Sequence, residues 1–196
     1  MADNKLKIYL YIDGTNLFAG QTELFGYQKI LPFSQILSEI KKLLPVDKIF
    51  FYASYMGVSA RSKPNLKKLI GIEAQFYKEV KRTPNLTFYK GHRSPSSGRE
   101  KGVDVHLAAD IIKDAFLKKY DQMAIMTGDA DLIYPVEIVK NLGLKTHALF
   151  FPNRFSLELA FKADYATVLN YEDKFNPFGR KLPKNLKIIA IKKPRM

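Results

Sequence analysis

The sequence of 196 residues contains no cysteine, which excludes disulfide bonds and thiolate metal sites. Any metal that the protein binds must therefore be held by oxygen or imidazole ligands. The sequence also lacks an uninterrupted apolar run of about 18 residues, the length that a membrane-spanning helix needs. We accordingly expect a cytoplasmic protein that works in a reducing environment and has no membrane partner.

Acidic residues are scarce relative to basic ones. The chain has 32 Lys and Arg against 19 Asp and Glu, which gives a formal net charge of +13. This balance favours a polyanionic partner, nucleic acid before an anionic membrane surface. The length and the 46% hydrophobic composition suit one domain with a substantial core.

Candidate strands alternate with candidate helices along the chain. Near-continuous apolar strands separated by amphipathic helices are typical of a parallel sheet covered on both faces. We therefore predict an α/β fold, a three-layer α/β/α sandwich with a mainly parallel sheet and its functional groups at the carboxyl ends of the strands. The predicted strands are 7–12, 48–55, 86–89, 122–126, 144–150 and 166–169, and the predicted helices lie around 33–44, 66–77, 103–115 and 133–142.

Acidic and amide side chains occur at three strand-to-helix transitions. Each of them alone suits a turn or a helix cap, and Asp131 is the best capping candidate because a helical pattern follows it directly. Together, carboxylates crowded at one sheet edge repel one another unless a cation neutralises them. Mg²⁺ or Mn²⁺ prefers such oxygen ligands and supports phosphodiester hydrolysis. The residues are Asp13 and Asn16 after the first strand, Asp104 in the first turn of a helix, and Thr127, Asp129 and Asp131 after the strand 122–126.

Two segments depart from the strand-helix alternation. The Gly/Ser/Pro-rich loop 91–102 leads into the helix of Asp104 and carries Arg93, Arg99 and Lys101, which we expect to position a nucleic-acid backbone. In the basic stretch after Asn170, residues 185–192 are a candidate edge strand or a segment that packs outside the sheet. We predict a domain spanning residues 1–170 and a basic extension spanning residues 171–196.

Three sequence stretches resemble the signatures of the NYN domain family, the LabA-like branch of the PIN-like nucleases. They are "YIDGTNLF", "EKGVDVHLAADI" and "TGDADLIYPVEIV", they follow the usual order, and the likeness spans residues 7–169. The resemblance implies a PIN-like sandwich, a Mg²⁺ or Mn²⁺ site and ribonuclease activity, most often on single-stranded RNA. By position, Asp13, Asp104 and Asp129 match the metal-binding acids, Asp131 an accessory acid, Asn16 the polar residue accompanying the first signature, and Thr127 a position where relatives often have Ser.

We thus predict a metal-dependent endoribonuclease with catalytic Asp13, Asn16, Asp104, Asp129 and Asp131. Arg93, Arg99, Lys101 and Thr127 are the predicted nucleic-acid contacts. A non-catalytic RNA-binding or regulatory module stays open, as do DNA as the substrate and a homodimer as the oligomeric state. An aspartyl phosphotransferase fits less well, because no second acid follows Asp13 at two residues and no Gly-rich loop with a suitable Lys is present.

The remaining polar residues of the Asp104 helix are expected to lie outside this site. His106 is two residues from Asp104, so on a helix it points about 200° away. Asp110 and Asp114 are neighbours on one helical face, which we expect to face solvent. His147 falls within a predicted strand and is expected to be structural.

Overall fold

A seven-stranded sheet organises the molecule, whose computed structural model describes residues 6–55, 64–93 and 100–192, with backbone alone for residues 65, 92, 93, 100 and 101. The strand order is β3-β2-β1-β6-β7-β8-β9, and every neighbouring pair is parallel. The strands are β1 (Ile8–Asp13), β2 (Val46–Ala53), β3 (Leu86–Lys90), β6 (Gln122–Met126), β7 (Lys145–Phe150), β8 (Tyr165–Tyr171) and β9 (Leu186–Ile191).

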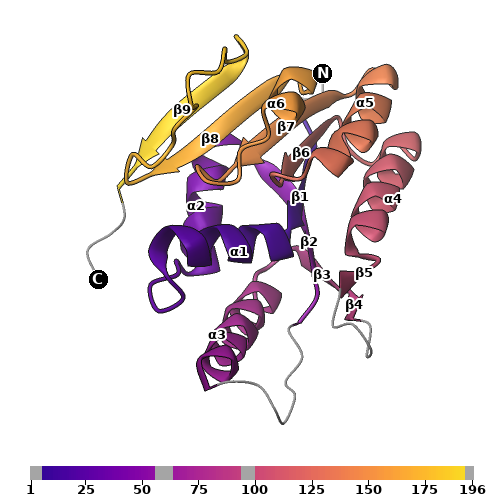
Figure 1. Ribbon diagram of the computed structural model, residues 1–196. Coiled ribbons are helices and arrows are strands. Elements are labelled where there is room, and N and C mark those ends of the chain that lie inside the picture. The colour runs from indigo at the N-terminus through magenta and orange to yellow at the C-terminus, as the bar shows by residue number, and fades with distance from the viewer. Residues whose placement is uncertain (1–5, 56–63, 94–99, 193–196) are drawn as a thin grey trace.

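Helices cover both faces of the sheet. One face carries α1 (Gly14–Phe25), α2 (Phe33–Leu43) and α3 (Pro64–Lys81), and the other carries α4 (Val103–Phe116), α5 (Ile133–Asn141) and α6 (Leu157–Lys162) (Figure 1). A short antiparallel pair, β4 (His92–Arg93) and β5 (Glu100–Lys101), precedes α4. The predicted three-layer α/β/α sandwich is therefore confirmed.

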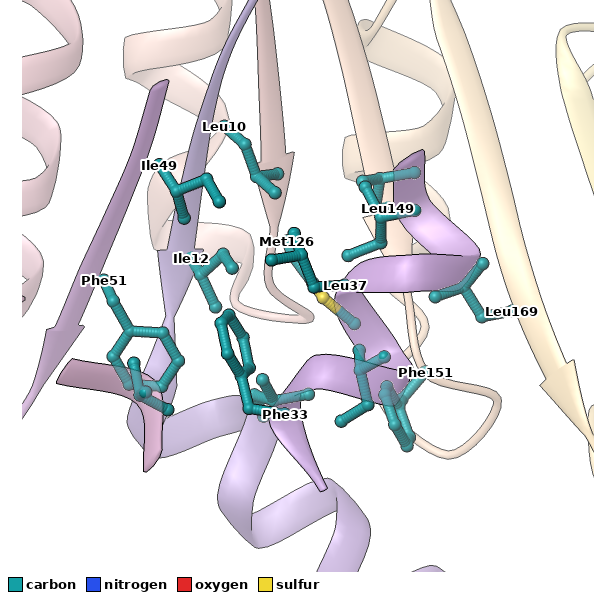
Figure 2. Packing of buried hydrophobic residues seen from close by; sticks show 14 of the residues in the cluster. Leu10, Ile12, Phe33, Leu37, Ile49, Phe51, Met126, Leu149, Phe151 and Leu169 are labelled. Atoms are coloured by element: carbon teal, nitrogen blue, oxygen red, sulfur yellow. The ribbon is translucent and has the colours of Figure 1, made fainter. Parts of the chain in front are cut away.

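The central strand β1 is buried along its whole length, because its side chains alternate between two cores. Leu10 and Ile12 face the α1–α3 side, where they pack with Phe33 and Leu37 of α2 (Figure 2). Tyr9 and Tyr11 belong to the core on the α4–α6 side. This two-sided burial is the reason that the first strand reads as a continuous apolar run.

The strand order reverses between β1 and β6. From β1 the chain builds outward through β2 to β3, and after β6 it builds in the opposite direction through β7 to β9. Open α/β sheets bind ligands in the crevice outside the carboxyl ends of the strands at such a reversal. Asp13 is the last residue of β1, and Thr127 directly follows β6.

The structure adds elements that the sequence pattern does not show. Helix α1 begins at Gly14, directly after Asp13, and α6 lies between β7 and β8. The candidate edge strand at 185–192 is confirmed as β9, which pairs parallel with β8. Among the residues that the structure describes, no helix has both the length and the apolar character needed to cross a membrane.

Candidate functional site

The Asp13 carboxylate joins three elements at the strand-order reversal. Its side chain is buried, and its Oδ2 accepts a hydrogen bond from the Thr127 hydroxyl at 3.0 Å. Its Oδ1 accepts a hydrogen bond from the Asn16 backbone amide at 2.9 Å and so caps α1. One carboxylate therefore links the end of β1, the start of α1 and the residue after β6.

The Asn16 side chain holds the turn that follows β6. Its Oδ1 accepts a hydrogen bond from the Gly128 amide at 3.0 Å. A Cβ at Gly128 would lie 2.4 Å from the Arg154 carbonyl oxygen, so only glycine fits between α1 and the loop after β7. The sequence predicts that Asn16 accompanies Asp13. In the structure, the Asn16 side chain links α1 to the turn at Gly128, which belongs to the third family signature.

Asp129 and Asp131 extend the same network. The Asp129 amide donates to Thr127 Oγ1 at 3.1 Å, and Asp129 Oδ1 accepts from the Asp131 amide at 3.0 Å. Asp129 therefore caps the short 3₁₀ helix η1 (Ala130–Leu132). The prediction that Asp131 is the cap is wrong, because Asp131 lies inside η1 with an exposed side chain.

Asp104 reaches the same edge of the sheet from a different element. It lies in the first turn of α4, just after Gly102, whose φ of 80° is in the left-handed region that favours glycine. Helix α4 packs over β1 and β2 and runs back toward their amino ends, so its first turn stands at their carboxyl ends. The Asp104 side chain is exposed there.

The donor chemistry of this edge fits a hard divalent cation. Asp13, Asp104, Asp129 and Asp131 offer carboxylate oxygens, the ligands that Mg²⁺ and Mn²⁺ prefer. Within the described residues, however, no three acidic or imidazole side chains are gathered closely enough to form a metal site. Mg²⁺ commonly takes one or two carboxylates directly and completes its shell with water and substrate phosphate, so the chemistry of the residues suits it.

The predicted nucleic-acid contacts are placed less completely. Arg99 lies outside the described residues, as do the side chains of Arg93 and Lys101, whose backbones belong to the β4–β5 pair ahead of α4. Thr127 is 2% exposed, and its hydroxyl acts within the network, as donor to Asp13 and acceptor from Asp129. This position differs from the direct nucleic-acid contact predicted for Thr127.

A loop that the sequence patterns did not single out supports the site from the β7 side. Asn153 Nδ2 donates to the Gly20 carbonyl at 3.0 Å, and the Arg154 guanidinium forms an ion pair with Glu23. Both contacts tie the loop after β7 to α1, while the Arg154 carbonyl abuts Gly128. In the sequence, this loop is marked by the Asn-Arg pair that follows a strand. The pair contains no acidic residue, so a search for acidic side chains at strand ends does not find it.

The prediction that Asp110 and Asp114 face solvent is wrong for Asp114 and holds only in part for Asp110, whose side chain is 29% exposed. Asp114 is buried and accepts a hydrogen bond from the Tyr11 hydroxyl at 2.9 Å, and Asp110 accepts one from the Tyr52 hydroxyl at 2.9 Å. Burial and then the Asp114 charge raise the pKa of Tyr11 far above its ordinary value, so this hydroxyl remains a donor. His106 is exposed and its ring stacks on Tyr89.

His147 is structural, as expected from its place in a strand. It lies in β7, its side chain is buried, and its Nε2 is 2.9 Å from the Thr167 hydroxyl in the neighbouring strand β8. Burial, and secondarily the positive charge of Lys187, lowers its pKa to about 4. The ring is therefore neutral at pH 7 and links two strands away from the acidic edge.

A parallel sheet with acidic side chains at the reversal of strand order is the architecture of a PIN-like α/β protein. Residues 7–170 match the family model of the NYN domain, and the chain therefore belongs to the NYN domain family. The predicted family is thus confirmed, whereas the LabA-like branch stays a prediction.

The comparison with solved structures supports the assignment of the fold and gives no information about the activity. The crystal structure of a protein of unknown function from Vibrio parahaemolyticus RIMD 2210633 superimposes with a TM-score of 0.60 at 17% identity, covering 89% of this chain and 98% of that chain. At this identity the likeness shows the fold alone. No curated protein matches the chain significantly.

Proposed function

We propose that this protein is a metal-dependent endoribonuclease that hydrolyses phosphodiester bonds in single-stranded RNA. The observation that carries the proposal is the hydrogen-bonded network joining Asp13, Thr127 and Asp129 at the strand-order reversal. Membership of the NYN family, which is nuclease-like, supports a nuclease. The net charge of +13 supports a polyanionic substrate.

In this proposal the acidic residues of the edge hold Mg²⁺ or Mn²⁺, with Asp13, Asp104 and Asp129 as ligands. When bound, such an ion polarises the scissile phosphoryl group and activates water for attack. Asp131, exposed beside Asp129, completes or supports the set. Asn16 holds the Gly128 turn in place and so fixes Asp129 relative to Asp13.

The buried hydrogen bonds explain how the chain keeps these carboxylates in position. Thr127 uses its one hydroxyl twice, to hold the side chain of Asp13 and the backbone of Asp129. Preorganised groups of this kind avoid reorganisation during the reaction. The basic residues Arg93, Arg99 and Lys101 are the proposed contacts that orient the RNA backbone next to Asp104.

The decisive experiment compares the wild-type protein with Asp104→Asn on labelled single- and double-stranded RNA and DNA, each with Mg²⁺, Mn²⁺ or EDTA. We expect wild-type cleavage of single-stranded RNA with either metal, none in EDTA, and a loss of cleavage in Asp104→Asn with RNA binding retained. Glu158→Gln is a matched control, because Glu158 is also an exposed acid in the first turn of a helix, α6. Equal cleavage by Asp104→Asn would contradict the assignment, and preferential DNA cleavage would change the substrate.

A non-catalytic RNA-binding or regulatory module is the second candidate, and one observation favours it. Asp13 and Asp129 both act as helix caps, a role that needs no metal and no substrate. This candidate predicts a binding shift with RNA that is unaffected by Mg²⁺ and leaves the RNA intact after long incubation. The same set of assays therefore separates the two candidates.

A further inference from the structure

A pocket of about 370 Å³ opens on the α4 side of the sheet, over β2 and β3. It exists because α4 packs over β1 and β2, which leaves β3 at the open edge of the sheet. Its floor comes from Phe50, Tyr52 and Tyr89, and lysines from β2 and the α4 side stand around it. The pocket is separate from the acidic network, since none of the network residues lines it among those described.

The floor of the pocket consists of aromatic rings in two groups, one around Phe50 and one around Tyr89. Phe50 stacks on Tyr11, with ring centroids 5.0 Å apart and planes inclined by 11°. The Tyr52 and Tyr89 centroids are 5.7 Å apart, and at the carboxyl edge Tyr89 stacks on the exposed His106 ring at 4.3 Å. Such flat π-surfaces stack on nucleobases of any sequence.

The lysines around the pocket differ in the groups that they contact. Lys113 pairs with Asp110, and Lys119 Nζ lies 3.0 Å from Asp114 Oδ1. Lys48 lies over the Tyr9 ring, with its Nζ 5.6 Å from the centroid. Lys48 is exposed, so its ammonium group is available for a phosphate.

Hydrogen-bond acceptors lie within the same space. The Asp110 carboxylate accepts from the Tyr52 hydroxyl and pairs with Lys113, and its oxygens retain further lone pairs for the amino groups of a base. Burial, followed by the hydrogen bond to Asp110, raises the pKa of Tyr52 far above its ordinary value, so that hydroxyl stays a donor to Asp110. The aromatic floor and the carboxylate acceptors suit a base, and the lysines at the rim suit a phosphate.

The pocket lies next to the acidic edge along α4. Asp110 follows Asp104 by six residues, which is about 9 Å along a helix axis at 1.5 Å per residue. His106 stands between the two on the same helix and is already stacked on Tyr89. A strand whose backbone crosses the acidic edge would therefore bring a neighbouring nucleotide to the pocket.

We propose that this pocket binds one nucleotide of a single-stranded nucleic acid, outside the acidic site. The base stacks on Phe50 and Tyr89, which line the pocket, while His106 extends the Tyr89 ring at the carboxyl edge, and the phosphate contacts Lys48. This inference rests on the proposed function, in which a single-stranded nucleic acid is the substrate. Tyr89, His106 and Lys48 are thus binding residues that act beside the acids and take no part in hydrolysis.

The test measures binding of a labelled single-stranded RNA by fluorescence anisotropy in EDTA, with His106→Ala, Lys48→Gln and Lys41→Gln. Lys41 is an exposed lysine of α2, on the opposite face of the sheet, and serves as the matched control. We expect His106→Ala to weaken binding about five-fold or more, because Tyr89 loses the ring that extends its stacking surface. Lys48→Gln should weaken binding and reduce the slope of log affinity against log salt by about 0.7, the value for one phosphate on a single strand.

Two further measurements complete the test. One distinguishes binding of a strand from binding of a free nucleotide, and the other checks that the variants are folded. A mononucleotide that displaces the RNA at the affinity of the RNA itself would overturn strand binding and assign the pocket to free nucleotides. Circular dichroism should show unchanged folding in all three variants, because the replaced side chains are exposed. A Tyr89→Phe variant, which keeps the ring, should bind like the wild type.

The outcomes distinguish this inference from the ribonuclease proposal. If His106→Ala and Lys48→Gln bind RNA as well as Lys41→Gln does, the pocket is overturned even when the protein cleaves RNA with Mg²⁺. If both variants bind more weakly while the wild type leaves RNA intact with Mg²⁺ and Mn²⁺, the pocket stands and the ribonuclease proposal fails. If the wild type binds no RNA, both are overturned.

Discussion

The Thr127 hydroxyl lies 3.0 Å from the Asp13 carboxylate, so the residue after β6 fixes the acid at the end of β1. We predict that Thr127→Val destabilises the protein by about 1–3 kcal/mol, because a buried carboxylate loses a donor and the Asp129 amide loses its acceptor. Cleavage of RNA should fall as well, since Asp13 and Asp129 lose their common support. Chemical denaturation and a cleavage assay measure the two effects. Thr127→Ser keeps the hydroxyl and should restore both; a serine variant as impaired as the valine variant would argue against this role.

Gly128→Ala is predicted to destabilise the protein by about 1–3 kcal/mol, as overpacking does elsewhere. The added Cβ would lie 2.4 Å from the Arg154 carbonyl oxygen, which is backbone and cannot move independently of its loop. Gly71→Ala is the matched control, because nothing lies within 4 Å of a Cβ at that position of α3. The control should gain about 0.5–1 kcal/mol from the helix preference of alanine. Equal unfolding free energies for the two variants would refute the close approach.

His147 gives a prediction for the dependence of stability on pH. Burial, and secondarily the charge of Lys187, lowers its pKa from 6.5 to about 4. The folded state therefore favours the neutral ring, and this contribution is complete above pH 6.5 and is lost as the pH falls toward 4. At about 1.4 kcal/mol per pKa unit the loss amounts to about 3 kcal/mol.

Denaturation curves between pH 7 and pH 4 test this dependence. His147→Gln, whose amide can still bond to Thr167, should show a smaller fall in unfolding free energy over that range. His106→Gln replaces an exposed histidine and should keep the full fall. An unchanged profile in His147→Gln would show that other groups cause the acid sensitivity.

Tyr11→Phe is predicted to cost about 1–3 kcal/mol, because the buried Asp114 carboxylate loses the donor that lies 2.9 Å away. Tyr134→Phe is the control, since the Tyr134 side chain is 68% exposed and should tolerate the change within about 0.5 kcal/mol. Thermal or urea unfolding of the two variants gives the difference. A cost in Tyr11→Phe no larger than in the control would mean that Lys119 alone satisfies Asp114.

The sequence alone predicts the three layers of the fold and the edge of the sheet at which the candidate site lies. Each buried strand is marked by its own apolar run, and the acids at strand ends are local features that parallel topology gathers at one edge. The start of α1 was missed because Gly14 reads as a turn residue, whereas Asp13 caps the helix through the Asn16 amide. The short α6 has a Ser156 cap but too few residues for a clear period.

The errors at the site arise from contacts between distant segments. Asp110 and Asp114 looked solvent-facing because their hydrogen-bond partners, Tyr52 and Tyr11, lie 58 and 103 residues away in the chain. The capping assignment was displaced by two residues, from Asp129 to Asp131, because the sequence does not show that a 3₁₀ turn precedes α5. The support from Arg154 depends on its carbonyl, which no side-chain pattern reveals.

Strand β9 has a consequence for how the chain can be shortened. It pairs with β8 from Ala166 to Tyr171, and Ile191 at its end is buried in the core on the α1–α3 side. A chain cut after residue 170, where the family match ends, would leave β8 paired with β7 alone and expose the edge that β9 covers. The buried strand β8 would then form the edge in place of β9, which is more exposed and carries Lys187. Because a charged edge strand discourages pairing with other chains, the last segment protects the folded protein against aggregation.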